Sequence, residues 1–138
     1  MRSLVKMAGL VVLVSARVAA GDLAPDMQAK FVKLLASSAG SAGKISCTSP
    51  ALLAELGKLG VANDASASVA WASSEAEVKA LKAAGKLVIC GKLDWLPSGG
   101  SIAVVEEGGK PQIYLHMGNI AASKAVVSDT VLRIGKRL

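Results

Sequence analysis

The sequence predicts an α/β fold, a three-layer sandwich on a mixed, mostly parallel sheet with a C-terminal antiparallel hairpin followed by a helix. Two observations predict it. Short apolar runs alternate with segments of helical periodicity, an order that implies right-handed crossovers between parallel strands. Two further strand-like segments then meet at a glycine pair, which is typical of a tight antiparallel reversal.

The first 20 residues have the layout of a secretory signal peptide. Arg2 and Lys6 precede a short apolar stretch, and small residues suit cleavage near Ala20. The apolar stretch is about half of the roughly 20 residues that a membrane-spanning helix needs. We therefore expect export to the periplasm, with residues 21–138 as a single domain that does not insert into the membrane after cleavage. Arg17, close to the cleavage site, leaves an uncleaved anchor as the alternative.

Charge and aromatic content argue against nucleic-acid binding. Sixteen basic and ten acidic residues give a formal charge of +6, but three of the basic residues lie in the leader. Residues 21–138 therefore contain thirteen basic and ten acidic residues, which gives them a net charge of +3. Apart from Arg133, Lys136 and Arg137 near the C-terminus, the basic residues are scattered, and aromatic residues are 3% of the chain. Nucleic-acid binders concentrate charge and stacking rings. We expect no nucleic-acid partner.

Three helices are expected from apolar residues at helical spacing between start and stop signals. They cover residues 26–40, 48–60 and 73–85, and each ends at a glycine. Ser49 is placed to cap the second helix, and Ser74 opens a capping box in the third.

Short strands alternate with these helices at 44–47, 68–71 and 86–90. The last is a continuous apolar run of the length expected for a buried parallel strand. The segment between the second helix and the second strand, 61–67, is expected to be a loop.

The hairpin is expected from alternating residues at 102–105 and 111–117, on either side of a Gly-Gly turn. A single closing helix is expected over 119–138, with Asn119 as its N-cap. Val126 and Ile134 are among the residues that this helix would bury.

Cys47 and Cys90 are candidates for one disulfide, because each ends a short strand and exported proteins meet an oxidising compartment. Neighbouring parallel strands would bring the sulfurs together, although pairing also needs Cα atoms within about 7 Å. Two buried thiols and a regulatory thiol pair are the alternatives. Cys47 and Cys90 are too far apart in the sequence to form a CxxC motif or a zinc cluster. We expect no metal and no cofactor.

Trp71 and Trp95, with Leu96 and Pro97, are expected near the carboxyl edge of the sheet. Open α/β sheets bind ligands or partners at this edge, and tryptophan is enriched at interface hot spots. The four residues are therefore candidates for a partner or ligand surface. The alternative is that both rings simply cover the core.

His116 is the one histidine of the chain, and its residue type titrates near neutrality. Catalysis would also need a nucleophile or second base in a defined geometry, and the Gly-x-Ser-x-Gly context is absent. Gly99 and Gly100 are turn residues, since neither Lys-Ser/Thr nor a helix follows them. We expect a structural histidine, no catalytic residue and no enzymatic activity.

The order of these segments resembles the YfiR-like family of small periplasmic proteins, over residues 27–137. The likeness is clearest in FVK (31–33), KLVICGKLDWLPSGGSIAVVEEGGKPQIYL (86–115) and AVVSDTVLRI (125–134).

A hairpin–helix motif carries most of this resemblance. Gly99 and Gly100 open the Gly-Gly-x-Ile hairpin that is typical of the family. His116 stands where the family has the asparagine of an Ile-Asn pair, and Ser128 begins Ser-Asp where the family has Ser-Ser. Histidine can replace one donor or acceptor of the asparagine, but not both in the same place.

The resemblance implies a periplasmic regulator without enzymatic activity. The namesake of the family restrains a membrane diguanylate cyclase through the periplasmic part of that enzyme, and so controls cyclic-di-GMP. By analogy, the expected partner is the periplasmic segment of a membrane signalling protein, bound by protein–protein contact. The alternatives are a periplasmic small-ligand-binding protein or enzyme with a cleft near Trp95, and an envelope protein without a regulated partner. A homodimer stays open.

Overall fold

A computed structural model describes residues 21–41 and 43–138, so the signal peptide expected at 1–20 lies outside the described residues. In chain order the elements are α1 (Pro25–Ser38), β1 (Lys44–Ile45), α2 (Pro50–Lys58), β2 (Ala62–Asn63), β3 (Val69–Ala72), α3 (Glu75–Ala83), β4 (Leu87–Cys90), the 3-10 helix η1 (Leu93–Trp95), β5 (Ile102–Glu107), β6 (Lys110–Leu115), α4 (Met117–Ala122), α5 (Asp129–Ile134) and β7 (Lys136–Arg137). None of the described helices has the length and apolar character to cross a bilayer.

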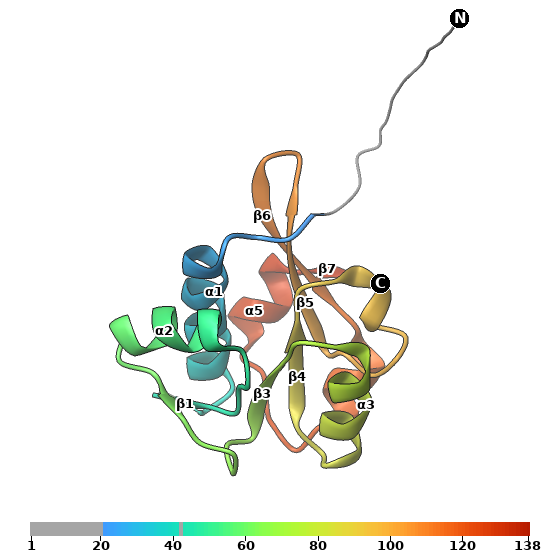
Figure 1. Ribbon diagram of the computed structural model, residues 1–138. Coiled ribbons are helices and arrows are strands. Elements are labelled where there is room, and N and C mark those ends of the chain that lie inside the picture. Colours follow the sequence, from blue (N-terminus) through green and yellow to red (C-terminus); the bar gives the residue numbers. More distant parts are fainter. Residues whose placement is uncertain (1–20, 42) are drawn as a thin grey trace, which may run out of the picture.

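The fold is the expected α/β sandwich on a mixed, mostly parallel sheet (Figure 1). Five strands lie in the order β3-β4-β5-β6-β7; the β5–β6 pair is antiparallel and the other neighbours are parallel. β1 and β2 form a second parallel pair, and a bridge from Ser46 to Ala70 places the end of β1 beside β3. The carboxyl ends of β1, β3 and β4 therefore lie at one edge.

Two apolar layers flank the sheet. Residues of α1, α2 and α5 pack on one face, and α3 with the η1 loop packs on the other. In β4, Ile89 belongs to the first layer and Cys90 to the second, because successive side chains of a strand point to opposite faces. Side chains of two strands can therefore contact each other only when they point to the same face of the sheet.

The starts of α2 and α3 confirm the predicted caps. The Ser49 hydroxyl accepts a hydrogen bond from the Leu52 N–H at 3.4 Å, and the Ser74 hydroxyl accepts one from the Glu77 N–H at 3.2 Å. The Glu77 carboxylate accepts in return from the Ser73 N–H at 2.7 Å, one residue before the position usual in a capping box. These contacts fix the residues at which the two helices begin.

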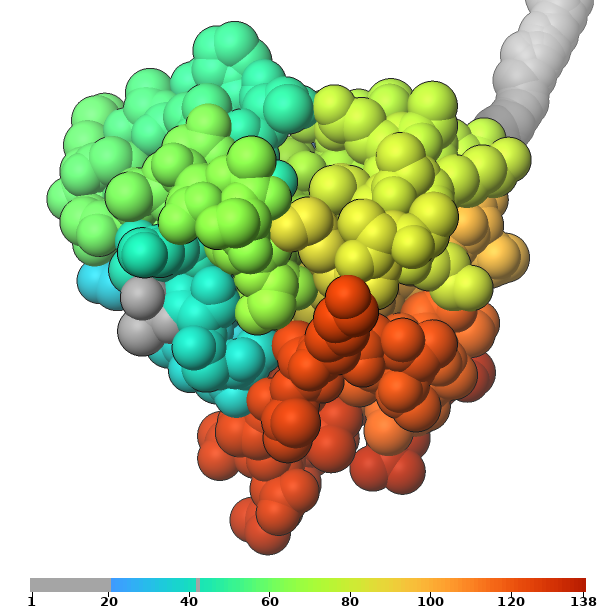
Figure 2. Space-filling model, turned by 90° about the horizontal axis from the view of Figure 1, so that it is seen from below, coloured from blue at the N-terminus to red at the C-terminus, as the bar shows by residue number. Residues whose placement is uncertain are grey.

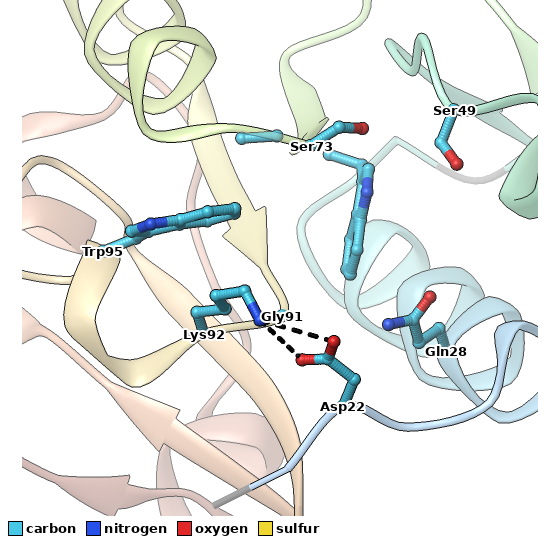
Figure 3. A pocket seen from close by; sticks show the side chains of 9 residues that line it. Asp22, Gln28, Ser49, Ser73, Gly91, Lys92 and Trp95 are labelled. Carbon is cyan, nitrogen blue, oxygen red and sulfur yellow. Dashed lines mark hydrogen bonds and ion pairs between the residues drawn. The ribbon is translucent and has the colours of Figure 1, made fainter.

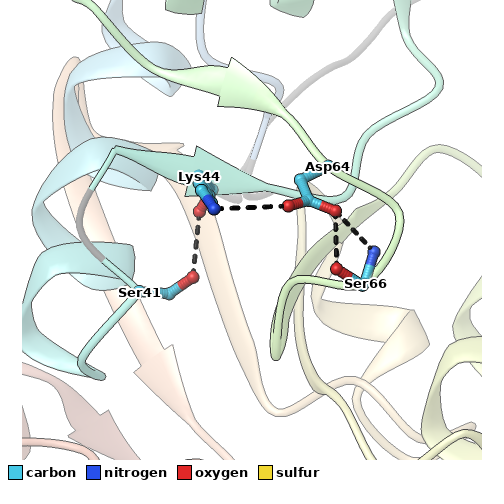
Figure 4. Close-up of polar contacts among 4 residues, drawn as sticks. All are labelled: Ser41, Lys44, Asp64 and Ser66. Atoms are coloured by element: carbon cyan, nitrogen blue, oxygen red, sulfur yellow. Dashed lines mark hydrogen bonds and ion pairs between the residues drawn. The ribbon is translucent and has the colours of Figure 1, made fainter.

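A small polar cluster closes the turn after β2 (Figure 4). The Lys44 ammonium lies 3.6 Å from the Asp64 carboxylate, and the N–H and hydroxyl of Ser66 donate to that carboxylate at 2.9 and 2.7 Å. The Ser66 hydrogen bonds, with a smaller contribution from Lys44, lower the pKa of Asp64. β2 itself adds a strand to a segment expected to be a loop.

The prediction of one closing helix over 119–138 is wrong. The chain forms two six-residue helices, α4 and α5, and then β7, which pairs in parallel with β6. At Ser123 the backbone becomes extended, and the hydroxyl donates to the Ile120 carbonyl at 2.7 Å. Val126 is 83% exposed and Ile134 is 51% exposed, so neither is a core residue.

Tertiary hydrogen bonds explain why the helix is interrupted. The Lys124 N–H donates to the Gly85 carbonyl at 2.9 Å, and the Ser128 N–H donates to the Ser38 carbonyl at 3.1 Å. The segment between α4 and α5 thus crosses the lower end of the molecule, from the α3–β4 turn toward the end of α1 (Figure 2). Ser128 lies at the N-cap of α5 without a side-chain capping bond.

His116 and Asn119 join the hairpin, α4 and the loop that follows β4. His116 is the N-cap of α4, and its Nδ1 accepts from the Asn119 N–H at 3.0 Å. The Asn119 side-chain amide donates to the carbonyls of Leu96 and Gly100, each at 2.9 Å. The helix cap expected at Asn119 therefore lies three residues earlier, at His116, and the asparagine side chain bonds to the η1 loop.

Gly100 is enclosed where this loop enters β5. A Cβ added there would lie 3.1 Å from the Cys90 Sγ, 3.1 Å from the Trp95 carbonyl oxygen and 3.3 Å from a Leu96 methyl carbon. A side chain at this position would have to displace buried atoms.

Gly100→Ala should lower the free energy of unfolding by about 1–3 kcal/mol, the usual cost of overpacking, measured by urea denaturation. Gly57→Ala is the matched control, because Gly57 lies in α2 with nothing within 4 Å of the added Cβ. That control should raise the free energy of unfolding by about 0.5–1 kcal/mol. Equal effects of the two substitutions would contradict the packing around Gly100.

Candidate functional site at the carboxyl edge of the sheet

A crevice of about 170 Å³ opens where the parallel strands end (Figure 3). It is lined by Asp22, Gln28, Ser49, Trp71, Ala72, Ser73, Gly91, Lys92 and Trp95. These residues come from the segment before α1, from α1 itself, from the end of β3, and from the segments that follow β1, β3 and β4. Open α/β sheets hold their ligands at this location.

Two tryptophans from opposite faces of the sheet line the crevice. Trp71 belongs to the layer beneath α1 and α2 and is 6% exposed, whereas Trp95 is half-buried against the α3 layer. A Cβ on Gly91 would lie 3.4 Å from the Trp71 ring and 3.4 Å from the Gln28 amide nitrogen. The glycine after β4 therefore lets the ring and the glutamine lie close to the backbone.

The other two residues predicted for this surface lie elsewhere. Leu96 is fully buried in the α3 layer, where it supports the η1 loop from beneath. Pro97 is exposed but does not line the crevice. The structure thus brings together two of the four apolar candidates.

An ion pair spans one side of the crevice (Figure 3). The Lys92 ammonium lies 3.0 and 3.3 Å from the two carboxylate oxygens of Asp22, and 6.0 Å from the centroid of the Trp95 ring. The side chains of Lys92 and Asp22 are 50% and 63% exposed. Solvent screens such pairs strongly, so this contact can open at little cost.

A second cavity of about 110 Å³ lies beside the first and shares Trp71 as a wall. Cys47 and Glu77 also line it, and the Glu77 carboxylate accepts from the Thr48 hydroxyl at 2.7 Å. Within 21–41 and 43–138 no three His, Cys, Asp or Glu side chains come together as a metal site.

Asp22, Gln28 and Lys92 were missed by reasoning from the sequence. Lys92 could have been found, because it stands two residues after the strand that ends at Cys90. Asp22 lies far earlier in the chain, and no local pattern relates it to the end of β4.

The predicted disulfide is wrong, because Cys47 and Cys90 are free, buried thiols. β3 lies between the strands that precede them, so these strands are not neighbours. Cys47 also belongs to the layer beneath α1 and α2, whereas Cys90 points into the α3 layer. Their sulfurs lie on opposite sides of the sheet, in agreement with the alternative of two buried thiols.

Burial sets the acidity of both thiols. It raises the pKa of Cys90 to about 11, and a backbone hydrogen bond at Lys92 lowers that pKa by less. Burial likewise raises the pKa of Cys47, and a backbone hydrogen bond at Ser49 lowers it by less. Neither thiol is activated as a nucleophile at neutral pH.

The Cys90 thiol should make the protein less stable as the pH rises from 9 to 11. In this range the unfolded chain releases the thiol proton and the folded chain keeps it, so unfolding becomes more favourable by up to about 1.4 kcal/mol per pH unit. Urea denaturation from pH 8 to 11 should therefore show a steeper decline for the wild type than for Cys90→Ala. Equal slopes would contradict the burial of the neutral thiol.

Thiol titration provides an independent check of the same site. Unfolded without reductant, the wild-type chain should react as two thiols, whereas a bridged pair would react as none.

Comparisons of the chain with models of protein families, with curated proteins and with solved structures gave no match. A function for the crevice therefore has to be argued from its own residues and from the resemblance described under the sequence.

Proposed function

We propose that this chain is an exported, non-enzymatic regulatory domain that binds the periplasmic segment of a membrane signalling protein through the carboxyl-edge crevice. The crevice between Trp71 and Trp95 is the observation that carries the proposal. The resemblance to YfiR-like proteins supports a partner of the diguanylate cyclase kind, with cyclic-di-GMP as the signal that it controls.

The size of the crevice favours a protein partner over a free small molecule. Pockets for drug-sized ligands enclose roughly 300–1,000 Å³, and this one encloses about 170 Å³. Such a volume suits one inserted side chain. Tryptophan and charged groups at the rim are typical of the anchors that dominate protein interfaces.

His116 and the two cysteines are occupied in structural roles, which supports a binding function for the protein over a catalytic one. The His116 Nδ1 is used to cap α4, and burial keeps both thiols protonated at neutral pH. The side chains that line the crevice supply one carboxylate, already paired with a lysine, and no imidazole or thiol. This set suits recognition by charge and stacking.

Export is tested by the N-terminus of the cellular protein. N-terminal sequencing of the chain from a periplasmic extract should begin at Gly21, the residue after the expected cleavage site. Full-length chain in the cytosol, with Met1 retained or simply removed, would overturn this part of the proposal.

Partner contact is tested by a photo-crosslinking residue, p-benzoylphenylalanine, in place of Ser73 in cells of the source organism. Ser73 lines the crevice, and Ala83, at the far end of α3, is the matched exposed control. The Ser73 position should capture an integral membrane protein with a periplasmic domain, and the Ala83 position should not. Adding Trp95→Ala should reduce this product at least fivefold at equal protein level.

The same product at both positions, or a product that Trp95→Ala leaves unchanged, would exclude the crevice as the contact site. Circular dichroism of the purified Trp95→Ala variant controls for its folding.

A further inference from the structure

The Asp22–Lys92 pair has the form of a cation site that the chain fills with its own side chain. The Lys92 ammonium contacts both oxygens of one carboxylate and lies within cation–π range of an indole (Figure 3). The carboxylate and the ring come from segments more than 70 residues apart in the sequence. The Asp22 carboxylate and the Trp95 indole together form the cation site, and the Lys92 ammonium occupies it.

Of the two charged groups, the carboxylate is the fixed one. Gly21, beside Asp22, exchanges two backbone hydrogen bonds of 2.8 Å with Glu106 of β5. Leu23, on the other side, is buried at 8% exposure. The backbone on both sides of Asp22 is thus anchored, and its carboxylate is carried on a short side chain. Lys92, in contrast, carries its ammonium on a flexible four-carbon stem. A competitor would displace the lysine and keep the aspartate.

The charge around the crevice favours a cationic competitor. The segments 21–24, 47–50, 73–77 and 91–98, which form this edge, contain four acids and one base, and the cleavage proposed above adds the α-amino group of Gly21 as a second positive charge. Asp22 and Lys92 line the crevice itself and Glu77 lines the neighbouring cavity, whereas Glu75 and Asp94 lie outside both linings. Residues 21–138 carry a net charge of +3 as a whole, so the side chains of these segments have the opposite sign to the rest of the domain.

We propose that the crevice binds an arginine side chain of the partner, whose guanidinium replaces the Lys92 ammonium on Asp22 and Trp95. The inference rests on the proposed function and identifies the chemistry of its contact. A guanidinium is planar, so it can donate two parallel hydrogen bonds to the carboxylate while stacking on the indole. Ser49, Ser73 and Gln28 line the same space and offer oxygen acceptors for the remaining N–H groups.

The test uses Nα-acetyl-arginine amide as the probe, titrated into the purified protein with NMR detection of the indole N–H signals. The chain has two tryptophans, so each signal can be assigned from a single variant. The Trp95 signal should shift saturably with the arginine probe. The citrulline analogue, which has the same shape without the charge, should bind at least tenfold more weakly, and the lysine analogue severalfold more weakly.

Two substitutions with opposite effects identify the site. Asp22→Asn should weaken binding of the arginine probe at least tenfold, since the charged acceptor is lost. Lys92→Ser should strengthen it about threefold or more, because the internal competitor is gone. A gain of affinity cannot arise from misfolding. Lys58→Ser is the matched control: it removes a comparable exposed ion pair, with Glu55 in α2 at 3.1 Å, and should leave binding unchanged.

The outcomes separate this inference from the proposed function. If Trp95 does not respond to the arginine probe, or if Asp22→Asn and Lys92→Ser bind it like the wild type, the arginine site is wrong. The membrane-protein crosslink at Ser73 would survive that result if the proposed function is correct. Conversely, a saturable arginine site without the crosslink would support the cation site and overturn the proposed partner.

Discussion

Because β1, β3 and β4 run in the same direction, the three segments that leave them must turn at one edge of the sheet. That alignment creates the space between Trp71 and Trp95. It also collects the starts of α2 and α3 there, where Ser49 and Ser73 face the crevice. The segment before α1 reaches the same edge by its bridge to β5, which brings Asp22 to Lys92.

The connection from β4 to β5 is the second element on which the site depends. It crosses between parallel strands with a single 3-10 turn, where most parallel connections use a full helix. Asn119 bonds two of its carbonyls, Leu96 fills the layer beneath it, and Gly100 permits its close approach to Cys90. Trp95 is thus presented by a loop that is anchored at Leu96 and Gly100.

Features that depend on local pattern were predictable from the sequence. Ser49 and Ser74 cap the helices expected of them, the apolar runs form β3 and β4, and the Gly108–Gly109 pair turns the hairpin with positive φ at both residues. The placement of Trp71 and Trp95 at the carboxyl edge followed from strand direction alone.

Features that depend on contacts distant in sequence were not predictable. The spacing of Val126 and Ile134 is helical, yet Lys124 and Ser128 bond to Gly85 and Ser38 and break the helix. The two cysteines each follow a strand, but spatial strand order and side-chain face keep them apart. Asp22 reaches the crevice through a bridge between residues 85 positions apart, and no local pattern encodes it.

The outermost strands, β2 and β7, are each two residues long and exposed, and β7 consists of a lysine and an arginine. Short, charged borders reduce the main chain on which a foreign strand could be added. β7 covers β6 only at Tyr114 and Leu115, and Pro111 in the uncovered part of β6 has no N–H to donate, which disfavours edge-to-edge extension of the sheet. A molecule built in this way can keep one end open for recognition and still resist fibrous aggregation.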